Sequence, residues 1–205
     1  MRARSNDRPG TAGQEFTAAT PIVLIGPMAV GKSAIGRQLA NHRAATFVDT
    51  DDLVVGQHGP IAEIFASRGE PAFREIEARA VAQAIEQSLG NSAVISLGGG
   101  AVLDSGTQQL LSRCMVVYLE CDAATVAERI ARNSVRPLLA GDAIGRWQTL
   151  FAARKPVYER LANLVLDVRS GTVPELTRRL ENALQEYAAE TAAVAPMPAA
   201  TKKVD

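Results

Sequence analysis

One glycine- and lysine-containing segment constrains the fold of this chain more than any other feature. Residues 26–33 read Gly-Pro-Met-Ala-Val-Gly-Lys-Ser, directly after an apolar run at 22–25 and directly before a helical pattern at 33–41. A turn from a buried strand into a helix gathers backbone N–H groups around one point, where the helix N-terminus adds positive potential. In this context the pattern predicts the Walker A loop that binds nucleotide phosphates. The alternative, a chance glycine turn, is disfavoured because strand, motif and helix occur in order.

Side chains within this segment fit the same interpretation. Lys32 supplies a point charge for the β and γ phosphates of a nucleotide, and the hydroxyl of Ser33 can bind Mg²⁺. Gly31 permits close approach of the backbone to phosphate. The interior of the loop, residues 28–30, is Met-Ala-Val and therefore bulkier than a glycine-rich loop. We expect these three residues to keep their backbone φ near the regions that are allowed for L-residues.

Five short apolar runs indicate the strands of the fold, and they lie at 22–25, 46–48, 93–97, 115–119 and 164–168. They are nearly continuous and rich in β-branched residues, which is typical of strands covered on both faces. Helical patterns separate them, at 33–41, 74–89 and 122–132, and a capping box at 172–175 opens the last helix. The alternation predicts an α/β fold with a five-stranded parallel sheet flanked by helices. Active residues should then lie at the carboxyl ends of the strands.

Composition limits the partners and the setting. The 205 residues suggest one domain, and the net charge of zero gives no electrostatic case for binding nucleic acid or an anionic membrane. No apolar run is long enough to span a bilayer, and no signal peptide is recognisable. The two cysteines have no metal-binding or redox spacing, which favours the cytoplasm.

The two ends of the chain differ from its middle. Residues 1–20 and 189–205 contain few apolar side chains, so we expect mobile tails around a single domain at 21–188. A targeting or partner-binding tail is the alternative.

Carboxylates follow the second apolar run, where residues 49–52 read Asp-Thr-Asp-Asp. Alternation along an extended segment would point Asp49 and Asp51 toward the phosphate loop. One carboxylate could then hold the magnesium shell, and the other could accept the proton of an incoming hydroxyl. The alternative is a cluster of helix N-cap residues before Leu53.

Four further segments combine special backbone and charge. Arg74 and Glu77 share a helix face and can pair, although an isolated surface pair would contribute little. Three glycines at 98–100 end the third strand and leave an open floor for a ligand, or simply a permissive turn. The segment 132–141 carries arginines between Pro and Gly, as a lid over phosphates would, or as a solvated loop would. Arg154 could bind a carboxylate through paired N–H donors. The alternative is an arginine at the C-terminus of a helix, where the helix dipole favours a positive charge.

Taken in order, these motifs resemble those of shikimate kinases, in the nucleoside monophosphate kinase superfamily of P-loop kinases. The resemblance covers roughly residues 21–187. It rests on Gly-Lys-Ser at 31–33, Asp-Thr-Asp at 49–51, Phe-Arg-x-Ile-Glu at 73–77, Gly-Gly-Gly at 98–100, Arg-Pro-Leu-Leu at 136–139 and Arg-x-Pro-x-Tyr at 154–158. No single motif is decisive beyond the P-loop kinases, but the series is specific.

The resemblance implies a reaction, its cofactor and an architecture. ATP, with Mg²⁺ as cofactor, would phosphorylate the 3-hydroxyl of shikimate to give shikimate 3-phosphate and ADP, on the pathway to chorismate and the aromatic amino acids. The family fold adds a lid, about residues 132–146 here, and a substrate-binding lobe, about residues 50–80. The family's usual state is a cytoplasmic monomer, without nucleic-acid or membrane partners.

The resemblance also implies roles for individual residues. Asp51 would be the base that receives the hydroxyl proton, acting with Lys32 and with the lid residue Arg136 on the phosphates. Shikimate would contact Asp51, Arg74, Arg154, Gly98, Gly99, Gly100, Phe65 and Phe73, with Glu77 orienting Arg74. The nucleotide would contact Ala29, Val30, Gly31, Lys32, Ser33, Ala34, Arg136 and, on the adenine side, Arg169. Ser33 and Asp49 would hold the metal, Asp49 through water.

Two departures from the family pattern and two rival functions remain. Ala29 replaces a frequent loop glycine and Ala34 replaces a frequent threonine, and either change can weaken nucleotide affinity without touching Lys32 or Ser33. One rival is a kinase for another small polyol acid, such as gluconate. The other is a nucleotide-binding regulator without chemistry, against which the intact acceptor residues argue.

Overall fold

The computed structural model of this protein describes residues 4–5, 16–17, 19–132 and 143–194. Its centre is a sheet with the strand order β1-β6-β5-β2-β4-β3. The strands are β1 (Arg4–Ser5), β2 (Ile22–Ile25), β3 (Thr46–Asp49), β4 (Ala93–Ser96), β5 (Met115–Glu120) and β6 (Leu164–Asp167). Strands β2 to β6 pair in parallel. The α/β class and the five parallel strands are therefore confirmed, with boundaries within one residue of those predicted.

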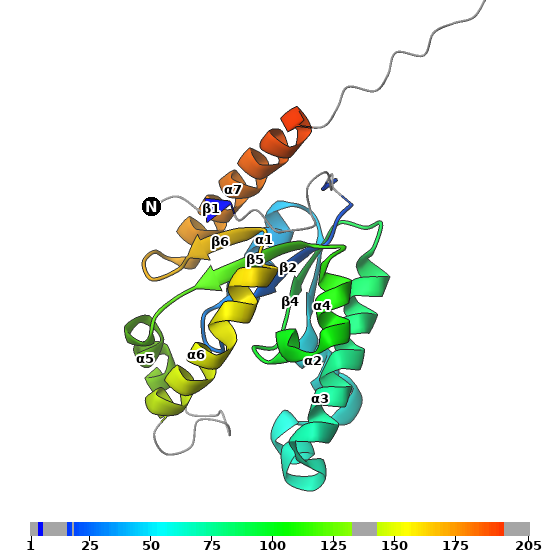
Figure 1. Ribbon diagram of the computed structural model, residues 1–205, viewed down its shortest axis with the longest axis vertical. Helices are drawn as coiled ribbons and strands as arrows, with labels where there is room; N and C mark the ends of the chain where they lie inside the picture. The colour runs from blue at the N-terminus through cyan, green and yellow to red at the C-terminus, as the bar shows by residue number, and fades with distance from the viewer. Residues whose placement is uncertain (1–3, 6–15, 18, 133–142, 195–205) are drawn as a thin grey trace, which may run out of the picture.

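Helices cover both faces of the sheet (Figure 1). They are α1 (Lys32–His42), α2 (Thr50–His58), α3 (Ile61–Ser88), the 3-10 turn η1 (Ala101–Leu103), α4 (Ser105–Leu111), α5 (Ala123–Arg132), α6 (Ala143–Leu161) and α7 (Val173–Val194). Ile22 and Leu24 of β2 belong to the core formed with α1 and α7. Val23 and Ile25 belong to the core formed with α3, α4 and the end of α6. Burial on both faces explains why the strands read as continuous apolar runs.

Helix α2 and the first turns of α3 form a lobe at the end of the molecule. A third apolar cluster fills it, with Val54, Ile64, Phe73, Ile76 and Ala80 buried. The sequence pattern predicted that this helix begins at residue 74, but α3 begins at Ile61. Its two parts are joined through Gly69, whose φ of 77° interrupts the helical backbone. Glycine has no Cβ and adopts this conformation at little cost.

The ends of the domain extend past the predicted limits. Within the segment predicted as an N-terminal tail, β1 pairs antiparallel with β6, and the Phe16 ring lies 5.8 Å from that of Tyr187. Helix α7 continues to Val194, beyond the predicted boundary at 188. Most of the predicted lid, 132–146, lies outside the described residues, as do most of the predicted C-terminal tail and Arg136. In the part of the chain that the structure describes, no helix combines the length and the hydropathy that a membrane crossing requires.

Candidate active site

The phosphate loop has the predicted strand–loop–helix context, between the end of β2 and the start of α1. Gly26 has a φ of 140°, and a Cβ there would lie 2.8 Å from the carbonyl oxygen of Leu119. Gly31 has a φ of 101° and is the N-cap of α1. Both conformations are unfavourable for residues with a Cβ, so the two glycines set the path of the loop.

Of the three interior residues of the loop, Ala29 occupies the least favourable of the φ regions allowed for L-residues. Its φ is 63°, in the left-handed region. A residue with a Cβ pays about 1–2 kcal/mol for that conformation. The buried side chain of Val30, the next residue, anchors the loop in the core and offsets this strain. Ala34 follows in the first turn of α1 with its side chain exposed.

The side chain of Lys32 reaches back to the first residues of the phosphate loop. Its Nζ donates hydrogen bonds to the carbonyl oxygens of Gly26, at 3.0 Å, and Pro27, at 2.9 Å. The side chain is buried although it is charged. These contacts hold the ammonium group over the loop, beside a cavity of about 440 Å³ that we call the phosphate-loop cavity. Ala29, Val30, Gly31, Lys32, Ser33 and Ala34 all line it.

Asp49 and Asp51 both line the phosphate-loop cavity, but their backbone is not the extended segment that was predicted. Strand β3 ends at Asp49, and Asp51 lies in the first turn of α2. Asp49 is the N-cap of that helix: its Oδ1 accepts a hydrogen bond from the N–H of Asp51 at 3.0 Å. Its Oδ2 accepts one from the Ser33 hydroxyl at 2.6 Å. The N-cap alternative is therefore correct for Asp49, which also meets the phosphate loop.

Thr50 holds these two carboxylates in place, a role that the sequence reasoning missed. Its hydroxyl donates to the carbonyl oxygen of Ser96 at 3.3 Å and accepts from the N–H of Gly98 at 3.1 Å. The side chain is fully buried. It ties the start of α2 to the end of β4, and the available signal was a threonine placed between two aspartates.

A second cavity of about 470 Å³ opens between the lobe and the sheet, and we call it the lobe cavity. Every residue predicted to contact the acceptor lines it: Asp51, Phe65, Phe73, Arg74, Glu77, Gly98, Gly99, Gly100 and Arg154. Met28, Asp51 and Gly99 line both cavities, so the two meet at these residues. The rings of Phe65 and Phe73 lie 4.6 Å apart and form an apolar wall.

Arg74 is held between two carboxylates. Its Nη1 donates to Glu77 at 2.6 Å, and its Nη2 donates to Glu70 at 2.8 Å. Burial disfavours the charge, but the ion pairs with Glu77 and Glu70 outweigh it, so the pKa of Arg74 is raised. The contact with Glu70 was missed, although the four-residue spacing is the usual signal of such a pair.

Glu77 is almost completely buried. Burial raises the pKa of its carboxyl group, the ion pair with Arg74 opposes that shift, and the nearby charge of Asp51 adds to it. The two carboxylates approach because Gly98 lies between them: a Cβ there would be 2.5 Å from Oε1 of Glu77 and 2.9 Å from Oδ1 of Asp51. The glycine at position 98 is thus required by the two neighbouring side chains and not only by the turn.

Arg154 projects from the interior of α6 into the lobe cavity. The helix continues to Leu161, so the alternative of a C-terminal arginine is wrong. The side chain is only 7% exposed. Among the ion pairs of the described residues, none involves Arg154, although Glu77 is near enough to interact with it electrostatically. A buried guanidinium without a paired carboxylate favours an anionic ligand.

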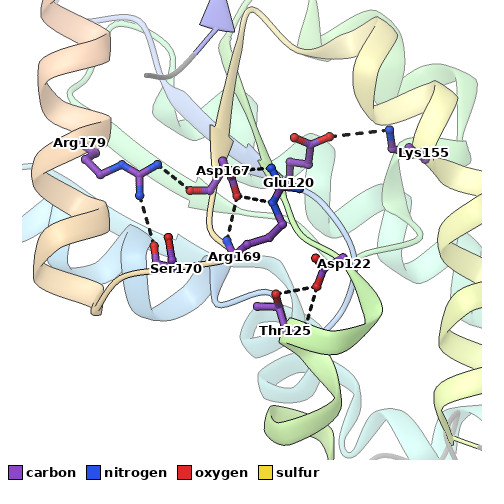
Figure 2. A network of polar contacts seen from close by, with 8 residues as sticks. All are labelled: Glu120, Asp122, Thr125, Lys155, Asp167, Arg169, Ser170 and Arg179. Carbon is purple, nitrogen blue, oxygen red and sulfur yellow. Dashed lines mark hydrogen bonds and ion pairs between the residues drawn. The ribbon is translucent and has the colours of Figure 1, made fainter. Parts of the chain in front are cut away.

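Arg169 lies apart from both cavities. Figure 2 shows it turned toward Asp167, to which Nη2 donates at 2.6 Å and Nε at 2.9 Å. These bonds lower the pKa of the Asp167 carboxyl group. Gly171 and Val173, which follow in the chain, line the phosphate-loop cavity instead.

Helix α6 contacts the phosphate loop directly. The indole N–H of Trp147 donates to the carbonyl oxygen of Met28 at 3.1 Å, and the ring is buried. Met28 also forms part of the wall between the two cavities. The sequence reasoning gave Trp147 no role.

Comparisons with known proteins agree with this arrangement. The family model described as "Shikimate kinase" matches residues 28–185. A shikimate kinase of Streptomyces coelicolor is 41% identical over 169 residues, which cover 82% of this chain and 97% of that protein. One of Mycobacterium avium is 45% identical over 151 residues, covering 73% and 84%.

Solved structures give the same relationship. The shikimate kinase of Acinetobacter baumannii, in complex with shikimate, has a TM-score of 0.77 and 28% identity, covering 82% of this chain and 93% of that one. A gluconokinase of Sinorhizobium meliloti has a TM-score of 0.62 at 17% identity, covering 87% and 98%, and shows only a shared fold. By its motifs, its sheet and these relatives, the chain belongs to the shikimate kinase family.

Proposed function

We propose that this protein transfers the γ-phosphoryl group of ATP to the 3-hydroxyl of shikimate, giving shikimate 3-phosphate and ADP. The observation that carries the proposal is the junction of the two cavities at Met28, Asp51 and Gly99. One cavity has a phosphate loop with Lys32, and the other has two arginines. A phosphoryl donor and an acidic acceptor bound in them would meet beside the Asp51 carboxylate.

The lobe cavity suits a small hydroxylated carboxylic acid. Arg154 and Arg74 supply two guanidinium groups for a single carboxylate, and arginine binds carboxylates through paired N–H donors. Glu77 fixes Arg74 by a hydrogen-bonded ion pair, and the rings of Phe65 and Phe73 would pack against the apolar part of the acceptor. Its volume of about 470 Å³ is that of a small-molecule site.

The phosphate-loop cavity would hold the triphosphate. Backbone N–H groups of residues 29–34 and the start of α1 would bind the phosphates, while Lys32 would move from the Gly26 and Pro27 carbonyls to the β and γ phosphates. The adenine base of the nucleotide would lie toward Gly171 and Val173. We keep Arg136 as the lid contact and Arg169 as an adenine-side contact, the latter requiring release from Asp167.

The residues fit a magnesium ion that is shared with the nucleotide. The Ser33 hydroxyl and the Asp49 carboxylate are hard oxygen donors 2.6 Å apart at the edge of this cavity. No group of three or more His, Cys, Asp or Glu side chains in the described ranges forms a complete metal cage. Ser33, and Asp49 through water, would therefore hold Mg²⁺ together with the phosphates. When bound, the ion neutralises charge on the β and γ phosphates.

Transfer then depends on position and charge. Asp51 accepts or orients the proton of the acceptor hydroxyl as its oxygen attacks the γ-phosphorus, and the bond to the β–γ bridging oxygen breaks to release ADP. Lys32 and Arg136 offset the negative charge of the transferring group. Closure of the lid over both ligands would exclude water, which otherwise competes with the acceptor. We also propose that the protein acts as a monomer in the cytoplasm.

A coupled assay of ADP release tests the function. We expect a strong rate increase on adding shikimate to protein, ATP and Mg²⁺, and little increase with gluconate. A rate that gluconate raises more than shikimate would support the polyol-acid rival. Nucleotide binding without an acceptor-dependent rate would support the regulator, and either result would overturn the proposal.

A further inference from the structure

Two stacked tyrosines lie behind the glycine floor. The rings of Tyr118, from β5, and Tyr158, from α6, are 5.4 Å apart with an interplanar angle of 21°. Both side chains are fully buried. They share one packing environment, but their hydroxyl groups differ. The hydroxyl of Tyr118 has no hydrogen-bond partner among the described residues, whereas that of Tyr158 bonds to the active site.

The hydroxyl of Tyr158 joins two parts of the lobe cavity. It donates to the carbonyl oxygen of Gly99 at 2.5 Å, and it lies near enough to Arg154, one turn away on the same helix, to interact with it electrostatically. Burial raises the pKa of Tyr158 to about 12, and the positive charge of Arg154 opposes that shift. The phenol therefore keeps its proton at any ordinary assay pH and remains a donor to Gly99.

The backbone of Gly99 also lies close to the backbone of Met28. A Cβ at Gly99 would lie 3.2 Å from the backbone nitrogen of Met28, in the phosphate loop. The Gly99 backbone is thus enclosed between the phosphate loop and the Tyr158 hydroxyl. A shift of this peptide would change the depth of the lobe cavity and the approach of the acceptor to the loop.

We propose that Tyr158 is a positioning residue for the acceptor: its hydroxyl fixes the Gly99 peptide, which forms the floor of the lobe cavity next to the phosphate loop. The inference rests on the proposed function, because it places the acceptor on this floor. Arg154 lines the same cavity and lies one turn from Tyr158 on α6. A floor that is already in position loses less conformational entropy when a ligand binds to it.

Two variants that each remove one buried oxygen test this assignment. Tyr158→Phe keeps the stacked ring but removes the bond to Gly99, and Tyr118→Phe removes the unpartnered hydroxyl of the same ring pair. For Tyr158→Phe we expect the KM for shikimate to rise about tenfold, with the KM for ATP within about twofold of wild type. Tyr118→Phe should leave both KM values within about twofold, since no bond is lost.

Steady-state kinetics with both substrates, with melting temperatures beside them, separate the outcomes. A purely structural hydroxyl would lower the melting temperature of Tyr158→Phe and leave its shikimate KM unchanged, and that result overturns the inference. An equal rise of KM in both variants also overturns it. Failure of the wild type to respond to shikimate would instead overturn the proposed function, and with it the assignment that depends on it.

Discussion

Replacing Gly100 with alanine is expected to weaken acceptor binding selectively, because the new methyl group would collide with Arg74. A Cβ at this position would lie 2.8 Å from Cζ of Arg74 and 3.0 Å from its Nη2. Backbone strain does not contribute, since Gly100 has a φ of −98° and a ψ of −14°, which alanine adopts. The guanidinium is also restrained by Glu77 and Glu70. The Gly100→Ala variant therefore displaces the guanidinium group of Arg74 without removing its charge.

The magnitude follows from the bonds that Arg74 would make to the acceptor carboxylate. A hydrogen bond to a charged group contributes about 1.5–3 kcal/mol. Because 1.4 kcal/mol corresponds to a factor of ten, losing one such bond should raise the KM for shikimate by about 10- to 100-fold. Gly100 does not line the phosphate-loop cavity, so the KM for ATP should stay within about twofold.

Initial rates of ADP release, with each substrate varied in turn, provide the measurement. The matched control is Gly56→Ala in α2, where a Cβ would meet nothing within 4 Å. That change removes the backbone freedom of a helical glycine and should stabilise the protein by about 0.5–1 kcal/mol without altering either KM. If Gly100→Ala keeps the wild-type KM for shikimate, the placement of the acceptor carboxylate at Arg74 is wrong.

Three further predictions address other parts of the protein. Asp51→Asn should lower kcat by about 10²–10⁴-fold while ATP affinity, measured by calorimetry, stays nearly unchanged; wild-type turnover would exclude Asp51 as the base. Trp147→Phe removes the bond to Met28 and should raise the KM for ATP about three- to tenfold at saturating shikimate. The hydrogen bond from Arg43 lowers the pKa of the Glu181 carboxyl group below its ordinary 4.5. The pair therefore contributes its full stabilisation at pH values above 4.5, and this stabilisation is lost as the pH falls through the lowered pKa. Glu181→Gln should therefore cost about 0.5–1 kcal/mol in neutral-pH melts and almost nothing in strongly acidic ones.

The sheet was predictable from sequence because each parallel strand is buried on both faces. Alternate residues of 22–25 enter different cores, so the whole run is apolar, and it is bounded by a proline and a glycine. Helix α2 was harder to predict, since it contains Gly56 and two adjacent valines, and neither residue type favours a helix. The start of α3 was obscured by Gly69 and Pro71, which usually end helices but here occupy a kink.

The lining of the site was also largely predictable, whereas its internal support was not. Arg74, Arg154 and the glycines of 98–100 stand in motifs of characteristic composition, and all of them line one cavity. Thr50 and Tyr158 hold the glycines of this motif through hydrogen bonds whose partners are set by tertiary packing. No periodicity or spacing in a single sequence encodes a contact from one element to another. Ala29 likewise gave no signal, since its left-handed backbone is imposed by the loop around it.

The order of the strands brings the phosphate loop, the glycine floor and the two carboxylates to one edge of the sheet. The phosphate loop follows β2, the glycine floor follows β4, and the carboxylates follow β3, and these three strands are consecutive in the sheet. The register pairs Leu24 with Ser96 and Ser96 with Asp49, so the three segments leave the sheet at the same edge. On the other side of β2 lie β5 and β6, and β6 leads to Arg169 and the loop before α7 (Figure 2). Under the proposed function, a nucleotide whose γ-phosphate points toward Gly99 would extend its adenine toward β6, because Gly171 and Val173 line that end of the phosphate-loop cavity.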